Sequence, residues 1–501
     1  MRVSRRTFLH SGALAVPALR FNKQASAALG SGKKTENRRL PRIRVNSDGH
    51  FLQTEDGQPF FWLADTAWEL IHATTREECS YYLHTRARQG FTVIQAVALS
   101  EFDNFQTPNV LGLRPFEDAK FSQPSEAYFA RVVEIVREAG SLGLYVALVP
   151  SWGDKLTAPW GMGPRIFRND NLKAARSYAK YVATKLSGES NLLWILGGDR
   201  PPLVNGMRNE FLERMAKEAG FPKDQDWRPI WREFAAGLKE GWGAEPCITY
   251  HPQGGSESSS LFLQSEPWLS FNGMQSGHGS GHDVPVWEWI ARDYQMQPAK
   301  PTLDLEPNYE DHPVNPWPTW DPANGYFRDW DVRKQTYRSV FAGGCGVTYG
   351  HGAIWGFAGP RNHAPLYPDR DWTDALQRPG GRQMIFLRGL VESRPYFRRV
   401  PDQKILRGDA GVGARHMQAT RDREGKYAFV YFPDRDMAAH LDLASMATRK
   451  LRAWWYDPRT GVASLEGVEE RDTFRSPSHG PDWVLVLDDP AVGFGLPGIG
   501  T

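Results

Sequence analysis

Two acidic residues stand directly after apolar stretches of the sequence and could act together as a catalytic pair. Asp199 ends the segment 193–199, and Glu306 comes near the end of the segment 301–307. Hydrolysis of a glycosidic bond needs one group that protonates the departing oxygen and another that attacks or stabilises the sugar carbon. Two carboxyl groups can do both if their environments differ. The pair therefore indicates the chemistry of glycoside cleavage.

A second set of polar and aromatic side chains follows the other apolar segments. A sugar site needs such a set, because hydroxyl groups require hydrogen-bonding partners and a sugar ring packs its apolar face on an aromatic side chain. The candidate substrate-binding residues are Asp65, Trp68, Trp152, Tyr250, His251, Gln275, His278, Tyr309, Glu310, His351 and Trp355. Asp65 stands out, because a carboxylate after the apolar segment 61–64 requires a partner or a ligand. The alternative for each aromatic residue or histidine taken singly is packing or a structural hydrogen bond.

A third group of side chains raises the question of a metal ion. His278, His282 and Asp283 lie close together in the sequence. The residues between the two histidines include a flexible Gly-Ser-Gly loop, and neither a His-x-x-x-His helix nor an Asp-rich calcium loop accompanies them. We therefore expect neither a metal ion nor a cofactor.

Eight short apolar segments alternate with segments whose apolar residues have helical spacing. The apolar segments are 60–65, 92–99, 144–152, 192–199, 247–251, 269–274, 301–306 and 346–349, and the helical ones include 127–139, 172–186, 211–219, 231–238, 286–294, 332–341 and 382–391. This alternation, with strands that are apolar almost throughout, predicts an α/β fold of the (β/α)8 TIM-barrel class. The alternative is an open doubly wound sheet, which the absence of a glycine-rich phosphate loop after the first strand disfavours.

The order of the predicted strands gives the two acids different roles. Asp199 ends the fourth strand and Glu306 the seventh, and a TIM barrel assembles its active site at the carboxyl ends of its strands. By analogy with the large clan of retaining barrel glycosidases, Asp199 is the expected acid/base and Glu306 the expected nucleophile. The alternative for either acid is a structural cap or an ion-pair partner.

The pattern changes beyond Pro395 to the alternation of antiparallel strands. The segments 427–432, 440–443, 451–456 and 483–487 are separated by turn sequences and predict a small β-sandwich. The expected division of the chain is a signal peptide at 1–27, a linker at 28–41, a catalytic barrel at 42–396 and an accessory sandwich at 397–501.

The amino-terminal residues have the pattern of an export signal. The pair Arg5-Arg6 precedes an apolar stretch at 13–19 and an Ala-Ser-Ala motif at 25–27, which together predict a twin-arginine signal that is cleaved after Ala27. The stretch is shorter than the roughly 20 residues that span a bilayer. We therefore expect a periplasmic or secreted protein without a membrane anchor in its mature form. The alternative is a chance pair of arginines.

Composition narrows the class of ligand. The 501 residues include 60 Lys and Arg against 58 Asp and Glu, and the net charge of +2 offers no broad field for nucleic acid or an anionic membrane. The 19 Trp and 17 Tyr suit sugar rings as well as protein cores. Cys79, Cys247 and Cys345 have no metal-ligand spacing, so free and mostly buried thiols are expected.

Several of these motifs resemble one known family. The segments 61–68, 194–199, 304–310 and 343–351 look like the apiosidase-like barrels of glycoside hydrolase family 140, and the resemblance runs over residues 44–396. The residues that follow resemble a β-sandwich that is labelled a collagen-binding domain. The resemblance implies that Asp199 is the acid/base and Glu306 the nucleophile, in agreement with the order of the strands.

The resemblance also implies an activity. Members of the family release apiose from side chains of rhamnogalacturonan II, a pectic polysaccharide. An exported enzyme with exo action on a branched polysaccharide or its oligosaccharides is therefore expected, and its oligomeric state stays open. One alternative is a glycosidase of the same fold that removes another sugar. The other is a non-catalytic carbohydrate- or matrix-binding protein, against which the presence of both carboxylates argues.

Overall fold

The computed structural model describes residues 39–157, 161–204, 210–218, 220–254, 258–317 and 319–499. The expected signal peptide at 1–27 and most of the expected linker at 28–41 lie outside these residues. Within the described ranges, no helix is both long and apolar enough to cross a membrane.

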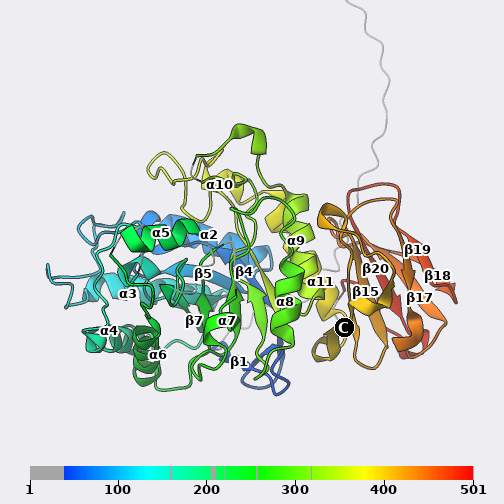
Figure 1. Ribbon diagram of the computed structural model, residues 1–501, viewed down its shortest axis with the longest axis horizontal. Coiled ribbons are helices and arrows are strands. Elements are labelled where there is room, and N and C mark those ends of the chain that lie inside the picture. The colour runs from blue at the N-terminus through cyan, green and yellow to red at the C-terminus, as the bar shows by residue number, and fades with distance from the viewer. Residues whose placement is uncertain are drawn as a thin grey trace, which may run out of the picture. The chain divides into compact units, whose positions relative to one another are not determined.

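Eight parallel strands of the described chain close into a barrel, as the sequence predicts. Figure 1 shows strands β4, β5 and β7 among them, with helices around them. They are β4 (Trp62–Thr66), β5 (Val93–Val97), β6 (Tyr145–Val149), β7 (Leu192–Gly197), β8 (Ile248–His251), β9 (Asn272–Met274), β10 (Thr302–Asp304) and β11 (Gly346–Tyr349). Six pair in the order β11-β4-β5-β6-β7-β8, and β10 pairs with β9. Backbone bonds join the two sets: the N–H of Ser270 donates to Ile248 O (2.8 Å), and the N–H of Cys345 donates to Thr302 O (2.9 Å).

Both faces of these strands are buried, which explains why the segments are apolar throughout. Because side chains alternate along a strand, Trp62 and Ala64 of β4 belong to the core inside the barrel, whereas Leu63 belongs to the core beneath the helices. Leu193 and Ile195 of β7 alternate with their neighbours in the same way. The interior is therefore a packed core, and only the strand ends can hold a substrate.

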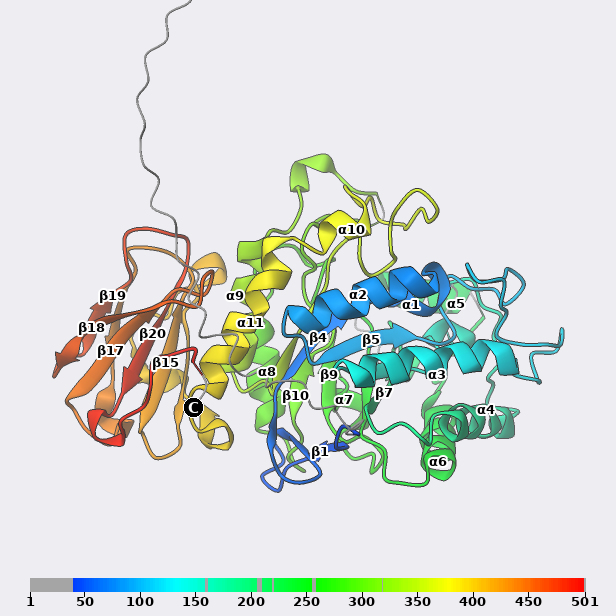
Figure 2. The same cartoon turned by 180° about the vertical axis from the view of Figure 1, so that it is seen from behind.

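Helices connect the strands and cover the outside of the barrel. They are α1 (Leu70–Ala73), α2 (Arg76–Arg88), α3 (Glu126–Ser141), α4 (Leu172–Lys185), α5 (Glu210–Glu218), α6 (Arg228–Trp242), α7 (Ser260–Leu263), α8 (Val286–Tyr294), α9 (Asp329–Phe341), α10 (Trp372–Ala375) and α11 (Pro379–Glu392). Figure 2 shows α2 and α3 beside strands β4 and β5. The helical segments predicted from apolar spacing are all present. The three cysteines are free and buried, as predicted.

Helix α2 is absent from the sequence-based expectation. Its buried face includes Thr85 and Arg86, so polar residues replace the apolar side chains that a helical pattern normally shows. The start of the helix carries a local signal: the hydroxyl of Thr75 accepts from the N–H of Glu78, and the Glu78 carboxylate accepts from the N–H of Thr75. This capping box satisfies two amide groups that would otherwise lack partners.

A small antiparallel sheet precedes the barrel and was also not predicted. It consists of β1 (Ile43–Val45), β2 (Leu52–Thr54) and β3 (Pro59–Phe60). Ile43, Leu52 and Phe60 pack onto the core inside the barrel. The sheet therefore closes the end of the barrel at which β4 begins, opposite the ends that carry Asp199 and Glu306.

The carboxyl-terminal residues form the predicted antiparallel sandwich. One sheet has the order β12-β14-β15-β20-β17-β18, and the other has the order β13-β16-β19. The strands are β12 (Arg399–Pro401), β13 (Leu406–Arg407), β14 (Gln418–Asp422), β15 (Tyr427–Phe432), β16 (Ala438–Leu441), β17 (Leu451–Tyr456), β18 (Ala463–Glu469), β19 (Thr473–Arg475) and β20 (Trp483–Asp488). Ala428, Val430 and Phe432 face the core between the sheets.

The other face of strand β15 packs against the barrel. Phe429 and Tyr431 belong to the same core as helices α9 and α11, and the ring of Tyr431 stacks on that of Tyr337 at 5.1 Å. Arg333 of α9 makes a bidentate pair with the buried Asp482, at 2.9 Å for both bonds. Both faces of this sheet are thus buried, one in the sandwich and one against the barrel.

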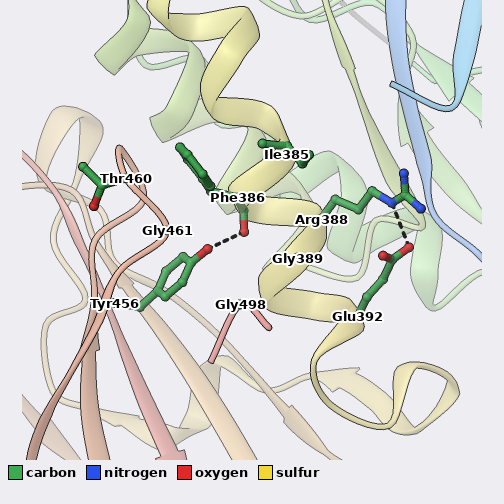
Figure 3. A pocket seen from close by; sticks show the side chains of 9 residues that line it. All are labelled: Ile385, Phe386, Arg388, Gly389, Glu392, Tyr456, Thr460, Gly461 and Gly498. Carbon is green, nitrogen blue, oxygen red and sulfur yellow. Dashed lines mark hydrogen bonds and ion pairs between the residues drawn. The ribbon is translucent and has the colours of Figure 1, made fainter. Parts of the chain in front are cut away.

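A cavity of about 380 Å³ lies where helix α11 meets the turn after β17. Figure 3 shows Tyr456, whose hydroxyl donates to the carbonyl of Phe386 at 2.7 Å. The carboxylate in its lining, Glu392, pairs with Arg388 at 3.0 Å. Because the lining holds one carboxylate with a partner rather than two, this cavity lacks the groups for glycoside hydrolysis.

Replacing Arg333 by Met tests how strongly the sandwich is joined to the barrel. The variant leaves the carboxylate of Asp482 buried without its cation, so the free energy of unfolding should fall by about 3–5 kcal/mol. The matched control is Arg137→Met, which removes a largely exposed arginine from its pair with Glu189 and should cost less than about 1 kcal/mol. Chemical denaturation of both variants measures the difference. Equal losses would show that the buried pair contributes no more than a surface pair.

Candidate active site

Asp199 lies just beyond the tip of β7, on a turn that only small residues permit. Gly197 and Gly198 have φ angles of 89° and 96°, and Asp199 itself has a φ of 52°. A Cβ atom on Gly198 would lie 2.7 Å from the ring of Trp152. Aspartate tolerates the left-handed conformation better than most residues. The turn leaves the Asp199 side chain 25% exposed at the carboxyl end of the barrel.

The surroundings of Asp199 favour its protonated form. Burial raises the pKa of Asp199, and the nearby carboxylates of Glu101 and Glu306 raise it further, whereas Arg200 and His251 lower it; the pKa comes to about 7. A carboxylic acid with this pKa keeps a proton near neutrality and can donate it.

Glu306 lies two residues beyond β10 and is held by two imidazole rings. Nε2 of His251 is 3.0 Å from Oε2 of Glu306, and Nε2 of His278 is 3.1 Å from Oε1. Burial alone would raise the pKa of Glu306, but the two histidines outweigh it and hold that pKa well below its usual range. Glu306 therefore stays ionised, as a nucleophile must.

His251 connects the two acids. The backbone N–H of Asp199 donates to Nδ1 of His251 at 3.1 Å. The other ring nitrogen, Nε2, is the one that faces Glu306. One imidazole thus contacts both residues of the predicted pair.

A hydrogen-bond network behind β10 fixes the backbone around Glu306. The N–H of Glu306 donates to Asp304 at 3.3 Å, and the hydroxyl of Ser276 donates to the same carboxylate. Gln335 of α9 donates to Ser276 at 2.6 Å and accepts from the N–H of Asn308 at 2.7 Å. Burial raises the pKa of Asp304 to about 7. No pattern in the sequence marks this network, because its members come from separate segments of the chain.

Aromatic side chains surround the pair. Trp68, Trp152 and His251 lie with ring centroids 5.2–5.6 Å apart. On the other side, Tyr309 packs edge-on against His278 at 4.4 Å. Five of the predicted substrate-binding residues are therefore collected around Asp199 and Glu306.

His312 completes this wall and was missed by sequence reasoning. Its ring stacks on that of His278 at 4.0 Å. Burial, together with the neighbouring His278, holds the pKa of His312 well below its usual range, so its ring is neutral. Its position shortly after Glu306 was the only signal in the sequence.

Two further candidates, and Trp152 again, carry buried polar atoms that have no protein partner among the described residues. They are the indole N–H groups of Trp152 and Trp355 and the amide oxygen of Gln275. Trp355 lies beside the half-exposed Phe102, with ring centroids 5.8 Å apart. Buried polar groups require hydrogen bonds, and sugar hydroxyls could supply them.

Two candidates on the barrel strands face the helices instead of the site. Asp65 accepts from Arg86 at 2.6 Å and from Tyr82 at 2.5 Å, both on α2. Tyr250 donates to the carbonyl of Arg200 at 2.9 Å and packs in the core beneath the helices. The structure therefore corrects their placement: Asp65 has the partner that its burial requires, and that partner is a structural ion pair.

Two candidates after β10 and β11 have structural partners as well. Glu310 accepts from Tyr349 at 2.7 Å and from the N–H of Gly380 at 3.1 Å. His351 is fully buried, and its Nε2 lies 3.2 Å from Asp311. These two side chains therefore bind the loops that follow β10 and β11 to their neighbours.

The three side chains considered for a metal ion have separate partners. His282 lies 3.2 Å from Asp331, and Asp283 pairs with Lys334 at 2.8 Å and with Arg338 at 3.0 Å. His278 contacts Glu306, as described above. In the part of the chain that the structure describes, no group of three or more His, Cys, Asp or Glu side chains could hold a metal ion.

Comparison with known proteins shows which families the two parts of the chain match. The sequence model of the family described as "Apiosidase-like, catalytic domain" matches residues 46–398. A second family, described as "Putative collagen-binding domain of a collagenase", matches residues 400–488. No curated protein matches the chain.

Two solved structures extend the comparison. A family 5 glycoside hydrolase from Bacteroides vulgatus is 28% identical, with a TM-score of 0.76 over 90% of this chain and 93% of that chain. A structure described as a glycoside hydrolase is 29% identical, with a TM-score of 0.76 over 90% of this chain and 97% of that chain. Both likenesses include the barrel and most of the sandwich.

Proposed function

This chain belongs to the apiosidase-like family of glycoside hydrolases, and from that premise we propose that it cleaves its substrate by a retaining mechanism with Asp199 as acid/base and Glu306 as nucleophile. One observation carries the proposal: the two carboxyl groups have opposite environments. Asp199 has a pKa of about 7, whereas two histidines keep Glu306 ionised. Carboxyl groups whose pKa values are pushed apart are suited to act as acid and nucleophile.

The first step forms a bond between Glu306 and the sugar. The carboxylate of Glu306 attacks the anomeric carbon, the bond to the departing oxygen breaks, and that oxygen takes the proton of Asp199. In the second step Asp199, now a carboxylate, accepts a proton from water. The resulting hydroxide attacks the anomeric carbon and releases Glu306, so both groups return to their starting states.

The two histidines prepare Glu306 for this reaction. His251 and His278 contact different oxygens of the carboxylate, so they restrict its rotation as well as its protonation. Trp68 and Trp152, next to His251, are the proposed platform for the sugar ring.

The proposed substrate is a terminal apiose on a side chain of a pectic polysaccharide such as rhamnogalacturonan II. The match to the apiosidase-like family supports this choice. The test is to incubate the purified mature protein with pectic and other plant or bacterial polysaccharides and identify the released monosaccharide. Release of a different sugar would keep the mechanism and change the specificity. Binding without release would favour a carbohydrate- or matrix-binding protein.

We also propose that the protein is exported by the twin-arginine route and acts in the periplasm or outside the cell. The residues that support this, 1–27, lie outside the described part of the chain. Amino-terminal sequencing of the protein from cell fractions tests it: a mature chain that starts after Ala27 is expected, and an uncleaved cytoplasmic chain would contradict export.

The pH dependence of kcat/KM follows from the two pKa shifts. Activity requires Asp199 protonated and Glu306 ionised. The rate should therefore fall as pH rises through about 7, where Asp199 loses its proton, and should fall on the acid side only at a pH well below the usual range of a glutamate. A pH profile of kcat/KM reports these groups in the free enzyme. A profile that stays flat well into the alkaline range would contradict the role of Asp199.

A further inference from the structure

Glu101 is a charged residue that neither the fold nor the catalytic steps above account for. It lies in the loop after β5, and its side chain is only 16% exposed. Its Oε1 accepts from Nη2 of Arg200 at 2.6 Å. Arg200 directly follows Asp199, so Glu101 contacts the immediate neighbour of the general acid.

The guanidinium of Arg200 is fixed between the two carboxylates. Its Nη1 donates to the backbone carbonyl of Asp199 at 2.8 Å and lies 3.3 Å from Oδ2 of Asp199. The Arg200 side chain is fully buried. A Cβ atom on Gly153 would lie 2.4 Å from Cγ of Arg200, so the backbone of the neighbouring turn packs directly on the arginine and limits its movement.

A permanent positive charge beside the general acid poses a problem for catalysis. Arginine stays protonated at any pH a protein experiences, and a cation favours the ionised form of a nearby carboxyl group. Asp199 must hold its proton until the leaving oxygen needs it. Something must therefore counter the charge of Arg200.

Glu101 is placed to do so. Its bond to Arg200 is 2.6 Å long, against 3.3 Å for the bond from Arg200 to the Asp199 carboxylate, and short charge-assisted bonds are the stronger ones. Resting on the function proposed above, we propose that Glu101 is a positioning residue: by pairing with Arg200, it leaves the carboxyl of Asp199 free to keep a proton and to face the leaving group.

The other charges near Asp199 do not replace Glu101. Glu306 is the proposed nucleophile, and His251 accepts from the N–H of Asp199 and lies 3.0 Å from Glu306. Asp154 and Lys155, in the short helix η2 (Gly153–Lys155), form a buried pair at 2.9 Å. Among the described residues, Glu101 is thus a carboxylate that pairs with Arg200 and takes no part in the catalytic steps proposed above.

The test is the pH profile of Glu101→Gln, which removes the charge and keeps the shape. The alkaline limb of kcat/KM should move to lower pH by roughly 1 unit, as expected for the loss of a charge at this distance, and the acidic limb should stay in place. A glycoside with a dinitrophenolate leaving group needs no protonation, so its cleavage should keep nearly the wild-type rate. Glu101→Asp, which retains the charge, should keep the limb near its wild-type position.

Glu117→Gln is the matched control, because Glu117 lies in the same loop region and is exposed. It removes one negative charge from an exposed position and should shift neither limb. An unmoved alkaline limb in Glu101→Gln, or an equal loss of rate at every pH and with both leaving groups, would overturn the proposal for Glu101.

The failure of this inference can be told apart from failure of the proposed function. If Asp199→Asn shows the leaving-group dependence of a lost general acid while Glu101→Gln leaves the profile unchanged, only the role of Glu101 is refuted. If Asp199→Asn cleaves glycosides with poor and with dinitrophenolate leaving groups at wild-type rates, Asp199 is not the general acid. The proposed role of Glu101 is then refuted as well.

Discussion

Replacing Glu306 by Gln should lower kcat by roughly 10³- to 10⁶-fold, the range seen when a catalytic nucleophile is removed. The amide cannot attack the anomeric carbon, and it is neutral beside two histidines that hold a carboxylate in the native protein. The expected loss is in kcat with any glycoside the enzyme cleaves, whatever the leaving group, because the nucleophile takes part in every turnover. Initial rates of the purified variant measure it.

Two further variants test the assignment of Glu306 as nucleophile: one by chemical rescue and one as a control. Glu306→Ala opens space for a small anion, so added azide should restore cleavage by attacking the anomeric carbon, with a glycosyl azide as the product. Glu288→Gln, which alters an exposed carboxylate on α8, should keep the wild-type rate. Near wild-type turnover in Glu306→Gln would refute the assignment.

Replacing Asp199 by Asn should lower kcat/KM by roughly 10²- to 10⁴-fold for substrates with a poor leaving group. The leaving oxygen then departs without a proton. The loss should be small in the first step for a dinitrophenyl glycoside, whose leaving group is stable as an anion, and the alkaline limb of the pH profile should disappear. Since the amide occupies the same space, the melting temperature should change little.

A uniform loss with both kinds of leaving group would contradict the role of Asp199 as general acid. Retention of the alkaline limb in Asp199→Asn would assign that limb to another group. Asp304 is the group to examine in that case, because it is also buried and its pKa is also raised to about 7.

The barrel fold could be predicted from the sequence because the strands of the barrel are buried on both faces. Each strand then appears as an apolar run, and the eight runs mark the eight strands. Because both faces of each strand are apolar, however, the sequence does not show whether a given side chain points into the barrel or toward the helices. Asp65 follows an apolar run just as a catalytic acid would, yet it occupies the outward position of β4 and pairs with Arg86.

The elements that were missed lack such a pattern. Helix α2 buries Arg86 and Thr85, so its apolar face is interrupted, and only the capping residues Thr75 and Glu78 marked its start. The strands β1–β3 are two or three residues long, which is too short for a periodicity to show.

The positions of Asp199 and Glu306 after the fourth and seventh barrel strands could be predicted from the sequence, but their electrostatic surroundings could not. The positions of Asp199 and Glu306 follow from counting strands. The contacts of Glu306 with His251 and His278, and the position of Glu101 against Arg200, join segments far apart in the chain. Such contacts depend on the closure of the barrel, which brings the ends of distant strands together.

The sandwich is joined to the barrel by buried charges as well as apolar packing. Arg394 makes a bidentate pair with Asp488, and Arg338 donates to the carbonyls of Gly413, Ala414 and His416. Helix α9 carries both Arg338 and Gln335, and Gln335 supports the backbone next to Glu306. The sandwich therefore packs on the helix that also contacts the loop of Glu306, the proposed nucleophile.

Trapping the covalent intermediate tests the central claim most directly. A 2-deoxy-2-fluoro analogue of the cleaved glycoside with a dinitrophenolate leaving group should react once and stall, because fluorine slows the second step. Mass spectrometry of the digested protein should then find one sugar, attached to the peptide that contains Glu306. A sugar on a different residue, or turnover that releases the inverted anomer without any adduct, would contradict the retaining mechanism with Glu306 as its nucleophile.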